Sequence, residues 1–275
     1  MQIYASHSPT YLYVNGLSVP REIVLREGVS LLPACATFSP ESIRTLDMDM
    51  SFGVAVIFLS RITSQIKIVG ELGEQFAIRV WNAGWDVMLV GAFFQREAVC
   101  NFECPDPAEK LGETSALKIT NMHFRGLASG PPAPLSESDV VWVEKHFEGG
   151  SKLMSDSRYS SAIHALSSYR WHSVPRAQIA VLWAGIEGLF EIDGELVFRI
   201  SLYISRFLEP NDEIKRRELF HSVKRLYSSR SKAVHGATLK GSARDVVTES
   251  AQLLCRLIRC CAEAQSLPDV TKLAP

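Results

Sequence analysis

The residues best suited to catalysis in this chain are Arg230 and His235, which stand five positions apart in the segment LYSSRSKAVHG at residues 226–236. An imidazole can accept a proton near neutral pH, which is what a general base must do. A guanidinium can bind two phosphate oxygens at once and can meet the charge that develops in a transition state. The two side chains together could act on a phosphate ester without a metal or another cofactor.

Helical spacing places Arg230 on an apolar stripe, formed with Phe220, Val223, Tyr227 and Val234. A charged group in that position needs a partner, and Glu187, at the margin of the apolar face of an earlier helix, is the candidate. His235 follows Arg230 by five residues, so in an ideal helix their directions differ by about 140°. They can face one cleft only if the helix ends near Val234, which Gly236 favours, or if a second chain completes the site.

The same kind of spacing occurs elsewhere in the chain, between Arg216 and His221 and between Arg158 and His164. Arg216 stands beside Arg217 in the run KRRE, and we interpret it as a structural or phosphate-positioning residue. Arg158 begins a polar helix. Neither of these pairs ends a helix, so we prefer the first pair.

Charge is distributed unevenly along the chain. Residues 1–150 carry 11 Lys and Arg against 17 Asp and Glu, whereas residues 151–275 carry 18 against 13. Between residues 215 and 244 there are nine basic residues and one acidic residue. A patch of that density suits a polyanion, although a solvated helix face is the alternative interpretation. The candidate residues for binding a nucleic acid in the patch are Lys224, Arg225, Lys232, Arg216 and Arg217.

The elements that precede this region, residues 1–130, are predicted to form a mixed α+β domain rich in strands. Residues 1–60 show short apolar runs ended by Gly or Pro and no helical spacing, which is typical of strands and turns. Residues 74–94 carry apolar side chains at steps of three and four and predict a helix. Composition typical of strands returns at residues 98–104 and 115–126. The Trp and Phe residues share the stripe of the aliphatic ones, so we expect them in the core rather than in a base-stacking platform.

A proline-rich segment at residues 131–136 predicts a linker between two domains. Residues 137–268 then predict six helices joined by short connections, which indicates an all-α bundle. We expect the first of these helices to end at Gly149 and Gly150, and the fifth to be capped by Asn211.

The third helix of the predicted bundle begins at Pro175 and has a broad apolar face. It contains Gly185 and Gly188, each of which disfavours a helix interior by about 1 kcal/mol relative to Ala. We therefore expect another backbone to pack closely against both glycines.

Several common enzyme classes have no signature in the sequence: a phosphate-binding P-loop, a dinucleotide fingerprint, a GxSxG elbow and an HExxH zinc helix do not occur. Cys100 and Cys104 would need two further ligands to hold zinc, so we expect two half-buried thiols and no metal. The chain has no secretory start and no apolar run near the roughly 18 to 20 residues that span a bilayer. These features predict a cytoplasmic protein with reduced cysteines, no membrane contact and no cofactor.

The segments LWAGIEGLFE at residues 182–191 and LYSSRSKAVHG at residues 226–236 resemble the paired signatures of the ApeA-like branch of the HEPN superfamily. Members of this family are helical bundles with an R-x4–6-H motif, and the resemblance covers residues 150–265. It implies a metal-independent endoribonuclease that often serves as a toxin or in antiviral defence. It also implies a homodimer through the helical bundle, in which the motifs of both chains face one cleft.

On this resemblance Arg230 and His235 correspond to the Arg and His of the family motif, and Ser231 and Glu187 take supporting positions. Many members continue with a Tyr two residues after the His, where this chain has Ala237, so any role of that Tyr is missing. RNA supplies its own nucleophile, the 2′-hydroxyl. The expected products are therefore a cyclic phosphate and a 5′-hydroxyl.

Two other interpretations remain open. A non-catalytic module could use the basic patch to hold RNA without cutting it, and its binding would weaken with salt. A dimerisation module could use the bundle only for assembly, with Arg230 and Glu187 as a structural ion pair.

Overall fold

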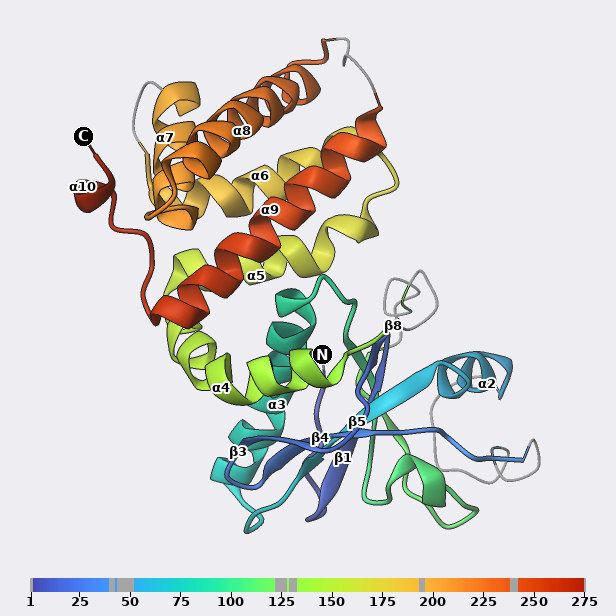
Figure 1. Cartoon of the computed structure of the whole chain (residues 1–275). Helices are drawn as coiled ribbons and strands as arrows, with labels where there is room; N and C mark the ends of the chain where they lie inside the picture. The colour runs from blue at the N-terminus through green and yellow to red at the C-terminus, as the bar shows by residue number, and fades with distance from the viewer. Residues whose placement is uncertain are drawn as a thin grey trace. The chain divides into compact units, whose positions relative to one another are not determined.

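The computed structural model shows an α+β chain in which a sheet of antiparallel strands is followed by a helical region (Figure 1). The predicted fold class, a strand-rich α+β region and then helices, is confirmed. The structure describes residues 2–39, 43, 52–121, 128, 133–192, 196–237 and 242–274.

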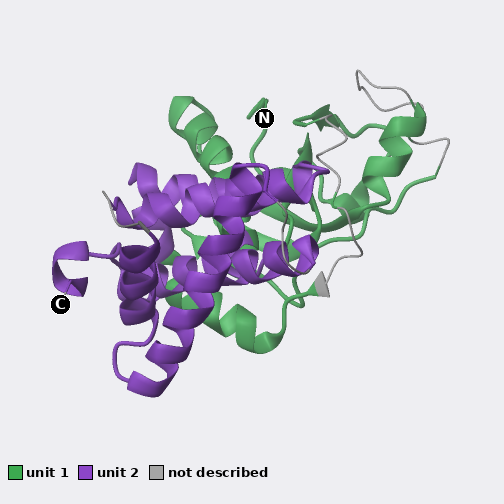
Figure 2. Cartoon of the chain, turned by 90° about the horizontal axis from the view of Figure 1, so that it is seen from above, with its two compact units in different colours: residues 1–91, 96–148 green, residues 92–95, 149–275 purple. Residues whose placement is uncertain are grey.

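The chain divides into two compact units (Figure 2), residues 1–91 with 96–148 and residues 92–95 with 149–275. The later division falls inside α4, the helix Glu137–Leu153, whereas the sequence places the boundary at residues 131–136. Part of that proline-rich segment, β8 (Ala133–Pro134), pairs in parallel with β2 (Leu17–Ser18) of the first unit. The prolines mark a change in the character of the sequence, whereas the division between the two compact units lies between residues 148 and 149.

The sheet of the first unit has the strand order β3-β4-β5-β1-β6-β7, and all neighbouring strands are antiparallel. β1 lies inside the sheet, so most of its residues are buried, and Leu12 faces Ile66 on one side and Glu103 on the other. The strand predicted at residues 98–104 corresponds to β6, and the one predicted at 115–126 corresponds in part to β7, while residues 122–126 lie outside the described part of the chain. The strands are β1 (Thr10–Asn15), β3 (Ile23–Arg26), β4 (Val29–Pro33), β5 (Ile62–Ile68), β6 (Val99–Cys104) and β7 (Lys118–Ile119).

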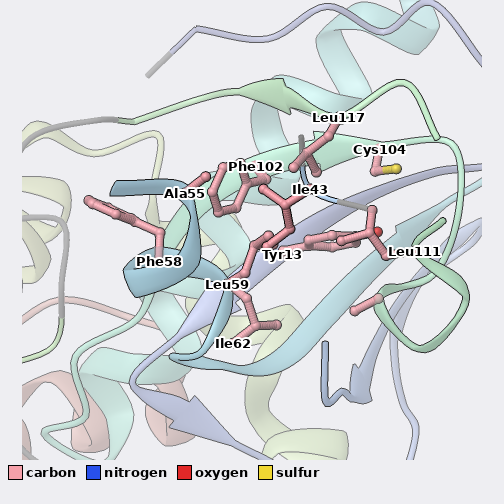
Figure 3. Close-up of a cluster of buried hydrophobic side chains, with 11 residues drawn as sticks. Tyr13, Ile43, Ala55, Phe58, Leu59, Ile62, Phe102, Cys104, Leu111 and Leu117 are labelled. Atoms are coloured by element: carbon pink, nitrogen blue, oxygen red, sulfur yellow. The ribbon is translucent and has the colours of Figure 1, made fainter. Parts of the chain in front are cut away.

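A hydrophobic cluster joins the sheet to α2 (Phe52–Leu59), as Figure 3 shows. Within it the rings of Phe58 and Phe102 meet edge to face, with 6.3 Å between their centroids. The prediction of strands and turns throughout residues 1–60 is wrong for α2. Its sequence FGVAVIFL is apolar on every side, and such a run gives no period that separates a buried helix from a buried strand.

α3 (Glu74–Phe93) confirms the helix predicted at residues 74–94. Phe76 and Val80 are buried, whereas the side chain of Trp81 is 40 % exposed. The expected core position is therefore wrong for Trp81. The buried face centres near Val80, and the next residue along a helix turns away by about 100°.

Cys100 and Cys104 lie on β6 and are both buried, more deeply than the half-burial that the sequence suggested. Within the described residues, no three His, Cys, Asp or Glu side chains are grouped so that they could hold a metal ion. In the same part of the chain, no helix is both long enough and apolar enough to cross a membrane.

The second unit is built around α6 (Pro175–Phe190), which packs against its neighbours α5, α8 and α9. Trp183, Ile186 and Leu189 of α6 are fully buried. The remaining helices of the unit, shown in Figure 1, are α5 (Ser157–Ser168), the short η3 (Tyr169–Trp171), α7 (Leu196–Leu208), α8 (Glu213–Val234), α9 (Ala243–Ala264) and α10 (Val270–Leu273).

Two predicted helix ends are wrong. α4 does not end at Gly149 and Gly150 but continues to Leu153. A Cβ atom on Gly149 would lie 2.5 Å from the carbonyl oxygen of Ala262, so this glycine permits a close approach instead of ending the helix. The predicted cap of α8 is displaced by one residue.

The N-terminus of α8 is capped by Asp212, not by Asn211. The carboxylate of Asp212 accepts the backbone N–H of Lys215 at 3.0 Å. A carboxylate at this position also suits the positive end of the helix dipole, which explains why it is preferred over the neighbouring amide.

The close approach expected at α6 is confirmed for one glycine. A Cβ atom on Gly185 would lie 2.7 Å from the Cβ of Ala165 on α5. At Gly188 the same atom would meet nothing within 4 Å, so the expectation is wrong there. Of the two glycines in α6, Gly185 is the one that packing requires.

Candidate active site

Arg230 on α8 and Glu187 on α6 form an ion pair. Nη2 of Arg230 donates to Oε2 of Glu187 at 2.9 Å, and the two side chains are 23 % and 26 % exposed. This confirms the partner that the apolar position of Arg230 predicted. The pair joins two helices whose contact residues are far apart in the sequence.

Aromatic side chains connect the ion pair to the core of the helical unit. The guanidinium carbon of Arg230 lies 5.5 Å from the ring centroid of Tyr227, a distance at which a cation is attracted to the ring. Tyr227 in turn meets Trp183 edge to face at 5.2 Å. The indole N–H of Trp183 donates to Oγ of Ser250 on α9 at 3.0 Å. Arg230 is therefore held over a core to which three helices contribute.

The ion pair leaves one donor atom and one acceptor atom without a hydrogen-bond partner within the described residues. Nε of Arg230 and Oε1 of Glu187 are buried and have no hydrogen-bond partner within the described residues. Burial raises the pKa of Glu187, and the charge and hydrogen bond of Arg230 oppose that rise. The contact between the two groups is thus a single hydrogen bond, which a competing anion could displace.

His235 occupies the turn that follows α8. The helix ends at Val234, as the predicted geometry required, and Gly236 has a φ of +74°, which glycine adopts without strain. The backbone N–H of His235 donates to the carbonyl of Ser231 at 3.0 Å, and the N–H of Ala237 donates to the carbonyl of Lys232 at 3.0 Å. The second bond is the signature of a Schellman turn, a common way to end a helix.

The imidazole of His235 is exposed, and among the described residues no hydrogen bond or ion pair joins it to Arg230 or Glu187. Ser231, the other predicted supporting residue, is half-buried and contributes its backbone carbonyl to the turn. The structure therefore brings Arg230 and Glu187 together and places His235 just beyond them, on an accessible turn. That the imidazole and the guanidinium face one cleft remains a prediction.

The predicted RNA-binding residues all lie on α8 but differ in their surroundings. Arg225 forms an ion pair with Glu249 of α9 at 2.6 Å. Arg217 and Lys224 are exposed, and because they stand seven residues apart they share one face of the helix. Arg216 and Lys232 are half-buried, so of the five predicted residues Arg217 and Lys224 are best placed to meet a ligand.

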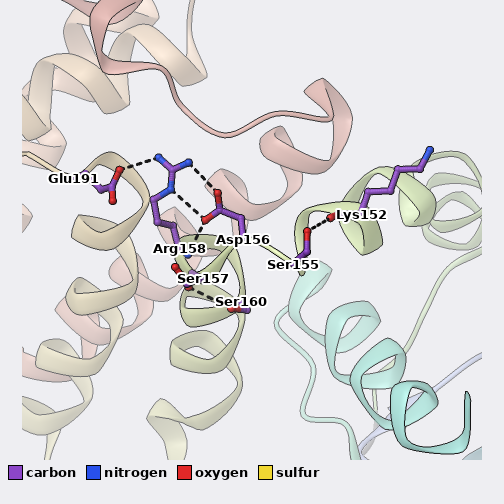
Figure 4. Close-up of polar contacts among 7 residues, drawn as sticks. All are labelled: Lys152, Ser155, Asp156, Ser157, Arg158, Ser160 and Glu191. Atoms are coloured by element: carbon purple, nitrogen blue, oxygen red, sulfur yellow. Dashed lines mark hydrogen bonds and ion pairs between the residues drawn. The ribbon is translucent and has the colours of Figure 1, made fainter. Parts of the chain in front are cut away.

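In the alternative motif formed by Arg158 and His164, the arginine belongs to a network of ion pairs and hydrogen bonds (Figure 4). Arg158 donates to Asp156 at 2.9 Å and to Glu191 at 3.1 Å. Asp156 also caps α5 by accepting the backbone N–H of Arg158, and this hydrogen-bonded arginine lowers the pKa of the Asp156 carboxyl. Arg158 and His164 are six residues apart on α5, so they point in directions about 120° apart. The network supports a structural role for Arg158.

Arg176 is a residue of this region that the sequence did not single out. Its Nη1 lies 3.3 Å from the carbonyl oxygens of both Lys232 and Ala233, and its Nη2 donates to the carbonyl of Ala237 at 2.7 Å. One signal was present: Arg176 directly follows Pro175 at the start of α6, where the helix dipole disfavours a cation. A cation in that place indicates a partner elsewhere.

No family model matches the chain, and neither a curated protein nor a solved structure matches it. The resemblance to the HEPN superfamily therefore remains a prediction made from the sequence.

Proposed function

We propose that the chain is a metal-independent endoribonuclease of the HEPN type, in which Arg230 and His235 act on the RNA phosphate. One observation carries the proposal: a half-buried arginine, held by Glu187 over the ring of Tyr227, stands five residues before an accessible histidine at the end of a basic helix. The arginine is oriented before the substrate arrives, and the histidine is open to it. Such preorganised charge is a principal source of catalysis.

The proposed reaction is an internal transesterification. His235 takes the proton of the 2′-hydroxyl, the 2′-oxygen forms a bond to phosphorus, and the bond from phosphorus to the 5′-oxygen breaks. The leaving 5′-oxygen takes a proton from water, and the products are a 2′,3′-cyclic phosphate and a 5′-hydroxyl. Arg230 binds the non-bridging oxygens, whose negative charge increases in the transition state.

Glu187 has a holding role in this scheme. Its single hydrogen bond orients Arg230 in the free protein, while Nε of Arg230 lacks a partner within the described residues. A phosphate oxygen that reaches the guanidinium gives that donor an acceptor, which recovers part of the free energy lost by burying it.

The exposed basic side chains of α8, foremost Arg217 and Lys224, would hold the RNA backbone, with Arg216 and Lys232 beside them. Arg225 contributes less because Glu249 already neutralises it. The resemblance to the HEPN superfamily supports a homodimer through the helical bundle and a role as a toxin or in antiviral defence, and we propose a cytoplasmic location with them. These statements are proposed together with the nuclease activity and would lose their support if the protein did not cleave RNA.

The test is incubation of the purified full-length protein with total RNA, with and without EDTA. We expect wild type to cut RNA equally well in both conditions and to leave cyclic phosphate ends, and we expect His235→Ala and Arg230→Ala to lose activity. The assignment is wrong if EDTA abolishes cleavage, or if both variants keep full activity.

A second function has its own support, because Arg230 already forms an ion pair with Glu187 and a cation–π contact with Tyr227 in the free protein. A module that binds RNA or dimerises without cleavage would use this pair only as a structural contact. It predicts RNA binding that weakens with salt and is unchanged in His235→Ala, with no cleavage by wild type.

A further inference from the structure

The C-terminal end of α8 is held by a side chain from another helix. The last carbonyls of a helix have no partner inside the helix. At α8, two of them, those of Lys232 and Ala233, lie 3.3 Å from Nη1 of Arg176. The carbonyl of Ala237, in the turn beyond the helix, accepts from Nη2 at 2.7 Å. One guanidinium thus binds the backbone on both sides of His235.

The charge of Arg176 stabilises the end of α8 and is unfavourable at the start of α6. Arg176 stands in the first turn of α6, near the positive end of that helix, where a cation is unfavourable. Its charge instead lies at the negative end of α8, where a cation is stabilising. Since Arg176 gains nothing from its own helix, its role is best explained by what it does for the end of α8.

We infer that Arg176 is a positioning residue for His235. It fixes the turn of residues 235–237 against α6 and so sets where the imidazole stands relative to Arg230. The inference rests on the proposed function, because it assigns to Arg176 an effect on the reaction through His235. It adds a second contact between α6 and the motif, since Glu187 of the same helix already holds Arg230.

Within the part of the chain that the structure describes, which stops at residue 237 here, the turn has few other constraints. Two backbone hydrogen bonds close it, from His235 to Ser231 and from Ala237 to Lys232, and His235, Gly236 and Ala237 are all exposed. A Cβ atom on Gly236 would meet nothing within 4 Å, so packing does not restrain the turn there. Helix ends with so little support fray readily. Arg176 opposes fraying at this end, because it binds backbone carbonyls before and after His235.

The chain offers a matched control in Arg206. Its Nη1 donates at 2.7 Å to the carbonyl of Leu273, the last residue of α10, so it makes the same kind of contact at another helix end. Arg206→Ala removes such a contact at the end of α10, while the contacts of Arg176 with the end of α8 stay in place. Arg176→Lys keeps the charge but cannot reach three carbonyls with one planar fork.

The first measurement is amide hydrogen exchange on the full chain, followed in peptides that cover residues 231–237. We expect Arg176→Ala to speed exchange of these amides by about tenfold, because hydrogen bonds from a charged donor are worth at least that factor. Arg176→Lys should give a smaller increase, and Arg206→Ala should give none in these peptides. Unchanged exchange in Arg176→Ala overturns the inference.

The second measurement is RNA cleavage. We expect Arg176→Ala to lower kcat by about ten- to a hundredfold, the size of effect that a small displacement of a catalytic group produces. KM should stay within about twofold, since the residues that bind RNA are unchanged. Arg176→Lys should restore part of kcat, which a general loss of folding would not allow. An Arg176→Ala variant with wild-type kcat, or one that raises KM alone, contradicts the inference.

The two proposals fail in different ways. If wild type cleaves no RNA, the proposed function is wrong, and hydrogen exchange alone decides whether Arg176 holds the turn. If wild type cleaves and His235→Ala does not, the function stands, and the kcat of Arg176→Ala decides the inference. Should Arg176→Ala fail to fold, Arg176→Lys is compared with Arg206→Lys by both measurements.

Discussion

The guanidinium of Arg230 and the carboxylate of Glu187 meet at 2.9 Å between α8 and α6, and each side chain is only about a quarter exposed. Neither group would be stable at this depth without the other, because a buried charge without a partner is strongly unfavourable. The same ion pair therefore orients the arginine proposed for catalysis and stabilises the contact between α6 and α8. A substitution that removes one partner tests both.

Arg230→Ala should destabilise the fold by about 2–3 kcal/mol, because it leaves a half-buried carboxylate without its cation. The double variant Arg230→Met with Glu187→Leu should recover most of that loss, since it removes both charges and keeps apolar volume. The measurement is the free energy of unfolding in urea. Equal losses in the single and double variants would contradict the assigned coupling.

Arg225→Ala is the control for this experiment. Its ion pair with Glu249 also starts from α8 but reaches α9 instead of α6, and the side chain of Arg225 is 59 % exposed. Exposed ion pairs contribute about 0–1 kcal/mol, so this variant should change the free energy of unfolding far less.

The two glycines of α6 should respond to alanine in opposite directions. Gly188→Ala should stabilise the protein by about 0.4–1 kcal/mol, because the new methyl group meets nothing within 4 Å and alanine favours a helix. Gly185→Ala should destabilise it, because the methyl group would lie 2.7 Å from the Cβ of Ala165 and 3.2 Å from Cδ2 of Leu254. Thermal unfolding of both variants gives the answer, and a shift of the same sign in both would contradict the packing.

Much of the helical unit could be predicted because the signals for its helices lie in short stretches of the sequence. Periodicity and caps located α6 and α9, and the end of α8 followed from Gly236. The pairing of Arg230 with Glu187 followed from placing a charge on an apolar stripe. The positions and ends of the helices depend on residues within a few turns of one helix, and the need of Arg230 for a partner depends only on its place on the apolar face of α8.

What could not be predicted depends on neighbours distant in the sequence. Gly149 resembles a helix end until Ala262 is seen against it, and α2 resembles a strand because it is apolar all round. Arg176 gave only an indirect signal, since its three acceptors are backbone carbonyls that belong to no motif. Contacts to main-chain atoms leave no trace in side-chain patterns.

The salt dependence of RNA binding should identify which basic residues meet the backbone. Each phosphate contact contributes about 0.7 to the slope of log affinity against log salt for a single strand. Lys224→Ala and Arg217→Ala should each lower the slope by about that amount, because both side chains are exposed. Arg225→Ala should lower it less, since its charge is already paired with Glu249.

Binding is measured by fluorescence anisotropy with a labelled single-stranded RNA in the His235→Ala background, so that cleavage does not interfere. A slope that is unchanged in Lys224→Ala and Arg217→Ala would remove both residues from the proposed RNA surface. A larger change in Arg225→Ala than in the other two would show that the ion pair with Glu249 opens when RNA binds.

The first unit carries a titratable group whose effect on stability has a definite sign. Asp86 on α3 is buried and forms an ion pair with Arg26 of β3, while its Oδ2 has no partner within the described residues. Burial raises the pKa of Asp86 to about 6, and Arg26 opposes only part of that rise. The folded protein therefore keeps a proton on Asp86 that the unfolded chain releases from about pH 4 upward.

Stability should accordingly fall as pH rises from about 4 to about 6, because the contribution of Asp86 is present below the unfolded pKa and lost through the folded one. The loss should be about 2–3 kcal/mol, and Asp86→Asn should abolish it. Asp269 is the control: its pKa is lowered by Thr271 and Lys272, so its contribution is lost as pH falls, and Asp269→Asn should leave the fall between pH 4 and 6 in place. Urea unfolding across this range measures all three proteins, and a wild-type stability that rises through the window would show that Asp86 is ionised in the folded state.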